Sequence, residues 1–143
     1  MINIDALKKS LIAHEGFRKK VYKDSKGILT IGVGRNIESK GLSRDEVLFL
    51  LDNDIAEVVS EMEKEPYYMA IRGDDVRCRV IIEMAFNLGE AGLEEFKKML
   101  AAVQSFHFEI ASEEMLNSKW ARQVGDRAKI LAQMMKTGVD ISE

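Results

Sequence analysis

The sequence has very little of the chemistry on which most nucleophilic and metal sites depend. Its 143 residues include one cysteine, two histidines and one proline. A lone cysteine forms no internal disulfide, and with His14 and His107 it gives no recognisable metal-ligand spacing and little basis for a Ser-His or Cys-His nucleophile. Cys78 lies in an apolar helical stretch, where a thiol is normally a packing residue. We therefore expect neither a metal nor an organic cofactor.

Long hydrophobic runs are also missing. The segment Met1–Asp5 lacks the basic start and the apolar core of a secretory signal, and no stretch has the roughly 20 apolar residues of a membrane span. We expect a protein that is made in the cytoplasm without a signal peptide and without stable membrane insertion.

The charge balance gives no support to nucleic-acid binding. The formal net charge is -3 and the pI is about 5.5. Basic residues gather towards the two ends of the sequence, whereas acidic residues gather in the middle. Either the basic ends form a face that attracts an acidic polymer, or the charges form an ordinary mixed surface, and the sequence favours neither reading.

Two carboxyl groups and a hydroxyl surround a short glycine-rich β segment. Glu15 ends an amphipathic helical pattern and is followed by Gly16, which is a natural helix terminator. Partial burial beside that apolar surface would keep Glu15 protonated, whereas Asp24 opens the turn Asp24–Gly27 and should be solvated and ionised. Cleavage of a sugar linkage needs such a pair of unlike carboxyls. Each residue alone is ordinary, and Thr30 alone is a typical strand residue.

The β signal is confined to residues 18 to about 36, and the remainder predicts helices. Ser43 and Glu46 fit a capping box at the start of a long helix that should end before Pro66. Further helices are expected at about 74 to 88, 93 to 103, 108 to 122 and 126 to 136. Apolar residues at helical spacing should form their core, chiefly Trp120 and the methionines Met84, Met99, Met115, Met134 and Met135.

The run from Glu15 through Asp24 to Thr30–Gly34 resembles the active-site stretch of the bacteriophage-type lysozymes, glycoside hydrolase family 24. The likeness continues through Met84–Gly89, Ser118–Trp120 and Asp126–Lys129 and covers most of the chain. It implies an α+β fold that is mostly helical and lysozyme-like, with a small N-terminal β-sheet lobe joined by a long helix to an all-α lobe. We treat residues 1–143 as a single catalytic domain, in which about 13–60 form the small lobe and 1–12 and 61–143 form the helical lobe.

The resemblance implies Glu15 as general acid, with Asp24 and Thr30 positioning water. The candidate substrate-binding residues are Asn36, Phe86, Asn87 and Arg127. Phe86 would be a platform for an apolar sugar face, Asn87 a hydrogen-bonding group, and Arg127, after the expected helix cap Asp126, would point towards the acid. Many family members have histidine where this chain has Arg35, for which the family suggests Asp54 as a partner.

The expected function is therefore a muramidase that hydrolyses the β-1,4 bond between N-acetylmuramic acid and N-acetylglucosamine in peptidoglycan, with inversion. In the family's lysis scheme a holin would let a monomeric enzyme reach the cell wall. A lytic transglycosylase and a wall-binding module without turnover are the alternatives. The paired Asp24 and Thr30 argue against the former, and the intact acid argues against the latter.

Overall fold

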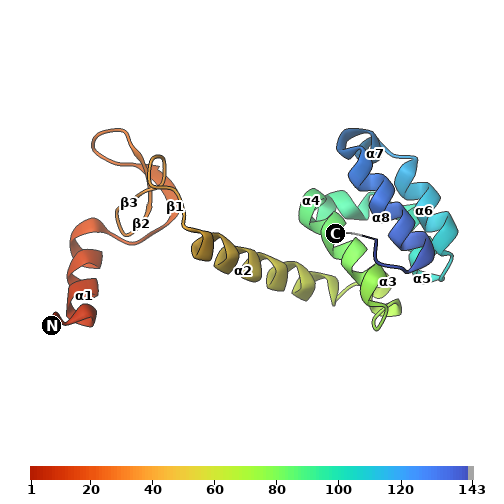
Figure 1. Cartoon of the computed structure of the whole chain (residues 1–143), viewed down its shortest axis with the longest axis horizontal. Coiled ribbons are helices and arrows are strands. Elements are labelled where there is room, and N and C mark those ends of the chain that lie inside the picture. Colours follow the sequence, from red (N-terminus) through yellow and green to blue (C-terminus); the bar gives the residue numbers. More distant parts are fainter. Residues whose placement is uncertain (142–143) are drawn as a thin grey trace. The chain divides into compact units, whose positions relative to one another are not determined.

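The computed structural model describes residues 1–141 and divides into two units, Met1–Leu50 and a second that begins at Leu51. The first unit opens with helix α1 (Ile4–Glu15), in which the Asn3 side chain accepts a hydrogen bond from Ala6 N at 3.0 Å (Figure 1). Gly16 adopts φ +88° and donates its N–H to Ile12 O, which ends the helix where the sequence predicts. The apolar positions of α1 are exposed, namely Ile4, Leu7, Leu11 and Ile12.

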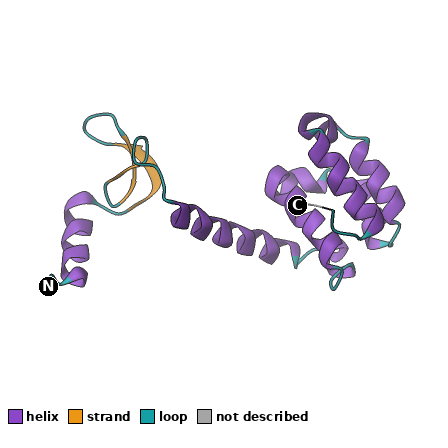
Figure 2. Cartoon of the chain, viewed as in Figure 1, coloured by secondary structure: helices purple, strands orange, loops and turns teal. Residues whose placement is uncertain are grey.

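A three-stranded antiparallel sheet follows, with the order β1-β2-β3. Its strands are β1 (Arg18–Lys23), β2 (Leu29–Gly32) and β3 (Arg35–Asn36). The register places Tyr22 opposite Thr30 on one side, and Thr30 opposite Asn36 on the other. All β structure in the described residues therefore lies within the predicted segment (Figure 2).

Helix α2 (Arg44–Met62) begins with the predicted capping box. Ser43 N donates to Glu46 Oε1 at 2.8 Å, and Glu46 N donates to Ser43 Oγ at 3.2 Å. These reciprocal bonds satisfy amide groups that have no partner inside the helix. The helix crosses the boundary between the two units and ends before Pro66, as expected.

Among its described residues, the second unit contains six further helices, of which one was not predicted. They are α3 (Pro66–Ala70), α4 (Asp75–Glu94), α5 (Lys97–Gln104), α6 (Phe108–Leu116), α7 (Lys119–Val124) and α8 (Asp126–Thr137). The unpredicted α3 starts at Pro66 itself, because proline is well suited to the first turn of a helix. A kink at Gly89 divides α4 close to its predicted end.

Two expectations in this unit were wrong. The single helix predicted at about 108 to 122 is two helices, because Ser118 accepts a hydrogen bond from Ala121 N and starts α7. Asp126 is not the cap of α8, since Gly125 holds that position and Asp126 is the first helical residue.

The core of the second unit is rich in methionine and helix-packed. Trp120 and the five predicted methionines are buried, together with Met62 and Leu93. Helix α8 packs against α4, α6 and α7 (Figure 1). The predicted α+β class, mostly helical with a small N-terminal sheet, is thus confirmed. None of the helices in the described part of the chain combines the length and apolar character that crossing a membrane requires.

Candidate active site

Glu15 is the last residue of α1, and its carboxyl lies against the backbone of Gly34 in the turn between β2 and β3. Within this unit taken by itself, the Glu15 side chain and the apolar positions of α1 are exposed, and the partial burial of Glu15 stays a prediction. The helix does place the acid next to the glycine-rich turn.

Asp24 occupies the predicted turn and is partly buried. Its Oδ1 accepts hydrogen bonds from Lys26 N at 2.8 Å and Ile28 N at 2.9 Å. The backbone closes the same turn, because Asp24 N donates to Ile28 O at 3.0 Å. Two amide donors on one oxygen fix the orientation of the carboxylate and leave Oδ2 as the oxygen directed to other partners.

Thr30 is the buried residue of the sheet, with 4% of its surface exposed. Its hydroxyl donates to Ile28 O at 2.8 Å. Because that bond takes the only hydroxyl proton, Thr30 Oγ1 can act towards a further partner only as an acceptor. Ile28 therefore bonds to both Asp24 and Thr30, which links the two predicted water-positioning residues through one backbone segment.

Asn36 lies opposite Thr30 in the sheet, so the first unit brings these two predicted site residues together. Its Oδ1 accepts a hydrogen bond from Ser39 N at 3.0 Å, which leaves the amide NH₂ as the group able to donate to a ligand.

Arg35 forms an ion pair with Glu46, where the resemblance suggested Asp54. Arg35 Nη2 lies 2.6 Å from Glu46 Oε2, and Nη1 lies 2.7 Å from Oε1. Nη1 also donates to Gly41 O at 3.2 Å. The hydrogen bond from the Ser43 backbone and those from Arg35 lower the pKa of Glu46 to about 2. This pair ties β3 to the start of α2.

The predicted residues of the second unit are exposed, and two of them share a groove. Phe86 is 45% exposed, unlike the buried Met84 and Ala85 beside it. It lines a groove of about 560 Å³ together with Arg127 and apolar side chains that include Ile55, Ile82 and Leu131. Within the second unit, Phe86 therefore lies outside the core, on the wall of this groove.

Asn87 is held by a residue that sequence reasoning assigned only to the core. Trp120 Nε1 donates to Asn87 Oδ1 at 2.8 Å, so the buried indole orients the exposed amide. Trp120 also packs edge-on against Phe96, with 6.1 Å between the ring centroids. A buried tryptophan needs a hydrogen-bond partner for its single N–H group. That requirement was the sequence signal from which a role of Trp120 in positioning a polar residue could have been predicted.

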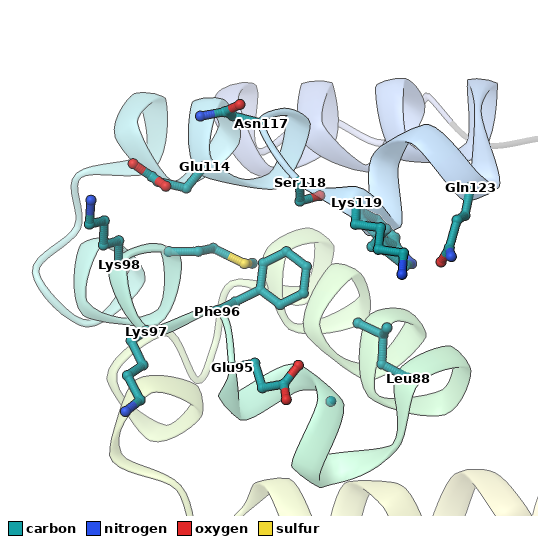
Figure 3. Close-up of a pocket in the computed structure, with 13 residues that line it drawn as sticks. Leu88, Glu95, Phe96, Lys97, Lys98, Glu114, Asn117, Ser118, Lys119 and Gln123 are labelled. Carbon is teal, nitrogen blue, oxygen red and sulfur yellow. The ribbon is translucent and has the colours of Figure 1, made fainter.

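Trp120 and Phe96 also line a second cavity, of about 520 Å³. Figure 3 shows charged side chains of both signs around Phe96, among them Lys97, Lys98 and Glu114. This mixed lining suits a polar ligand that carries both hydrogen-bond donors and acceptors.

Within the described residues, Glu65, Glu90 and Glu94 form the carboxylate cluster able to hold a cation. Their ligand oxygens lie within 4.8 Å of one another. Burial and the two neighbouring glutamates raise the pKa of Glu65. Exposed acidic groups of this kind are common without an ion, so we assign no metal to them.

Comparisons with known proteins identify the family of the chain. The model of the family described as phage lysozyme matches residues 12–136. The chain belongs to the phage lysozyme family. Membership of this family supports a muramidase-type peptidoglycan hydrolase, and the matched range contains Glu15, Asp24 and Thr30.

Three relatives of this phage lysozyme family member share about a quarter of their aligned residues with it. The chain is 25% identical to "Probable T4-type lysozyme 1" of Dictyostelium discoideum, in an alignment that covers 94% of this chain and 96% of that protein. It is 24% identical to "Probable T4-type lysozyme 2" of the same organism, with the same coverage. It is also 26% identical to the pre-baseplate central spike protein Gp5 of Enterobacteria phage T4, over 87% of this chain and 26% of that protein.

Proposed function

We propose that this protein is an inverting muramidase that cleaves the β-1,4 bond between N-acetylmuramic acid and N-acetylglucosamine, with Glu15 as general acid. The observation that carries the proposal is the linked arrangement of Asp24 and Thr30 on Ile28, in the same small unit as Glu15. A water-positioning pair of this kind has a use only where water is a reactant.

In this mechanism Glu15 donates its proton to the glycosidic oxygen as the C–O bond breaks. Water then attacks the opposite face of the sugar carbon and gives its proton to Asp24. Asp24 Oδ2 and Thr30 Oγ1 accept hydrogen bonds from this water, because the other capacities of these groups are used by the backbone. Inversion requires the two carboxyls to stand roughly 6.5 to 9.5 Å apart during the reaction.

The binding roles proposed for the remaining residues follow from their exposure and bonds. Phe86 offers an exposed ring to the apolar face of a sugar, and Asn87 offers the amide that Trp120 orients. Asn36 contributes a free NH₂ donor, and Arg127 a cation for the acidic polymer. We propose that residues 1–143 act as one catalytic domain, as a monomer, in host cell lysis with a holin opening the way to the wall.

Mass spectrometry of the soluble fragments released from purified peptidoglycan tests the proposal. Fragments that carry one added water are expected from the wild type, because hydrolysis leaves a reducing end. Glu15→Gln keeps the shape of the side chain but has no acidic proton to transfer to the leaving oxygen, so it should remain folded and release nothing. Asp24→Asn should also cause a severe loss.

The same spectra separate the alternatives. Fragments one water lighter would identify a lytic transglycosylase. Binding to the wall without release would identify a non-catalytic module. Cleavage retained by Glu15→Gln would remove the assigned acid.

A further inference from the structure

Gly34 stands where a side chain would collide with the acid. It lies in the turn between β2 and β3 and adopts φ +65°. A Cβ atom on Gly34 would stand 2.5 Å from Glu15 Oε2, 3.1 Å from its Cδ and 3.3 Å from its Cβ. Because Gly34 has no Cβ, the Glu15 side chain can occupy the volume that a side chain at position 34 would need.

We propose that Gly34 is a positioning residue for Glu15, because the missing side chain lets the carboxyl rest against the turn. The inference depends on the proposed role of Glu15 as general acid. It assigns to the second glycine of the Gly32-Val33-Gly34 turn a function in placing the reacting oxygen, in addition to the conformational role that any glycine has there.

The neighbouring glycines show that positive φ alone does not explain Gly34. Gly16, Gly27 and Gly32 adopt φ of +88°, +79° and +70°, yet a Cβ on any of them would meet no heavy atom within 4 Å. A substitution at those positions strains only the backbone. Gly32 is the closest match, since it ends β2 directly before the same turn and has nearly the same φ.

The consequence of filling the space should fall on the rate rather than on the fold. Glu15 is exposed, and its Oε2 is the end of a flexible side chain, so the carboxyl can move away from an added methyl group at little structural expense. What moves is the acid itself. A misplacement of about 1 Å in a catalytic group can lower the rate on the order of a hundredfold.

The experiment compares Gly34→Ala with Gly32→Ala as its matched control. Initial rates of fragment release are measured over a range of concentrations of soluble peptidoglycan chains, to separate kcat from KM, and stability is measured by urea unfolding. Both variants should show similar falls in urea midpoint, because both place alanine at positive φ. Gly34→Ala should lose roughly a hundredfold in kcat with KM nearly unchanged, and Gly32→Ala at most a few-fold. Equal losses of kcat would overturn the proposal.

A second pair of variants keeps the test decisive if Gly34→Ala does not fold. If the collision with Glu15 is what prevents folding, the Glu15→Ala background removes the colliding Oε2 and Cδ atoms. In that background Gly34→Ala should fold and lower the urea midpoint no more than Gly32→Ala does. A larger fall in that background would show that the turn alone demands this glycine. Turnover by Glu15→Gln would defeat the assigned acid, whereas its inactivity beside an active Gly34→Ala would defeat the positioning role alone.

Discussion

Glu46 performs two structural tasks with one carboxylate. It closes the capping box with Ser43 and pairs through both oxygens with Arg35. Such paired, charge-assisted hydrogen bonds are stronger than neutral ones and hold a defined geometry. They also require the ionised form, so the bonds from Ser43 and Arg35 lower the pKa of Glu46 to about 2.

The free energy of unfolding should therefore depend on pH through the ionisation of Glu46. The pKa of Glu46 is about 2 in the folded chain against an ordinary value of 4.5, so its contribution to stability is complete above about pH 4.5 and disappears as the pH falls towards 2. We expect the wild type to exceed Glu46→Gln in urea midpoint at pH 6 and this difference to close by pH 2. A difference that stays constant with pH would contradict the assignment.

Arg35 should make that contact insensitive to higher pH. A guanidinium stays charged throughout the accessible range, whereas a histidine loses its charge near pH 6.5. In Arg35→His, stability should therefore fall as the pH rises from 5 to 8, and the wild type should show no such fall. Identical stability profiles from thermal unfolding at each pH would remove the support for a stabilising Arg35–Glu46 pair.

At the scale of elements, Arg77 on α4 anchors the end of α8. Its Nε donates to Met135 O at 2.6 Å, and its Nη2 donates to Lys136 O at 3.0 Å. The same guanidinium pairs with Asp74 at 2.8 Å and lies 3.6 Å from the centroid of the Phe108 ring. The last carbonyls of a helix have no partner inside it, so a cation there satisfies both their hydrogen bonds and the helix dipole.

Removing this anchor should weaken the second unit. Arg77→Gln loses bonds to two carbonyls and one carboxylate, with an expected destabilisation of about 2 kcal/mol in urea unfolding. Arg79→Gln is the control, because Arg79 is more exposed and its pairs with Asp75 and Asp140 are surface pairs worth about 0 to 1 kcal/mol. Equal effects of the two substitutions would show that the carbonyl contacts add nothing.

At the scale of the whole molecule, the hydrophobic core lies after Leu51. Every buried apolar side chain of the described residues belongs to the second unit, whereas Thr30 is the buried residue of the first. Taken by itself, the second unit therefore contains a hydrophobic core, and the first contains a short sheet around Thr30.

Two residues of α4 test this division. Met84 is fully buried, so Met84→Ala should lose about 2 to 5 kcal/mol of stability through lost transfer energy and a cavity. Phe86, two positions later, is 45% exposed, so Phe86→Ala should change stability little while lowering kcat/KM several-fold. Urea unfolding and fragment release measured on both variants give the comparison. A large loss of stability in Phe86→Ala would show that the Phe86 ring contributes to the core.

The sequence by itself determined the features that depend on residues a few positions apart. These include the end of α1 at Gly16, the Asp24 turn, the capping box of α2, the β segment and most of the helices, whereas α3 and the break between α6 and α7 were not predicted. The packing of Trp120 and the methionines was predictable because apolar side chains at helical spacing are driven out of water together. Local hydrogen bonding and hydrophobic periodicity depend on residues that are close together in the sequence.

Only the tertiary structure decided which distant residues meet. It gave Arg35 the partner Glu46, placed Phe86 and Arg127 in one groove, and held Asn87 by Trp120, 33 positions away. It also placed the Glu15 carboxyl against Gly34. Such contacts depend on how the helices and strands pack and on where their side chains then point. Neither can be inferred from local sequence patterns.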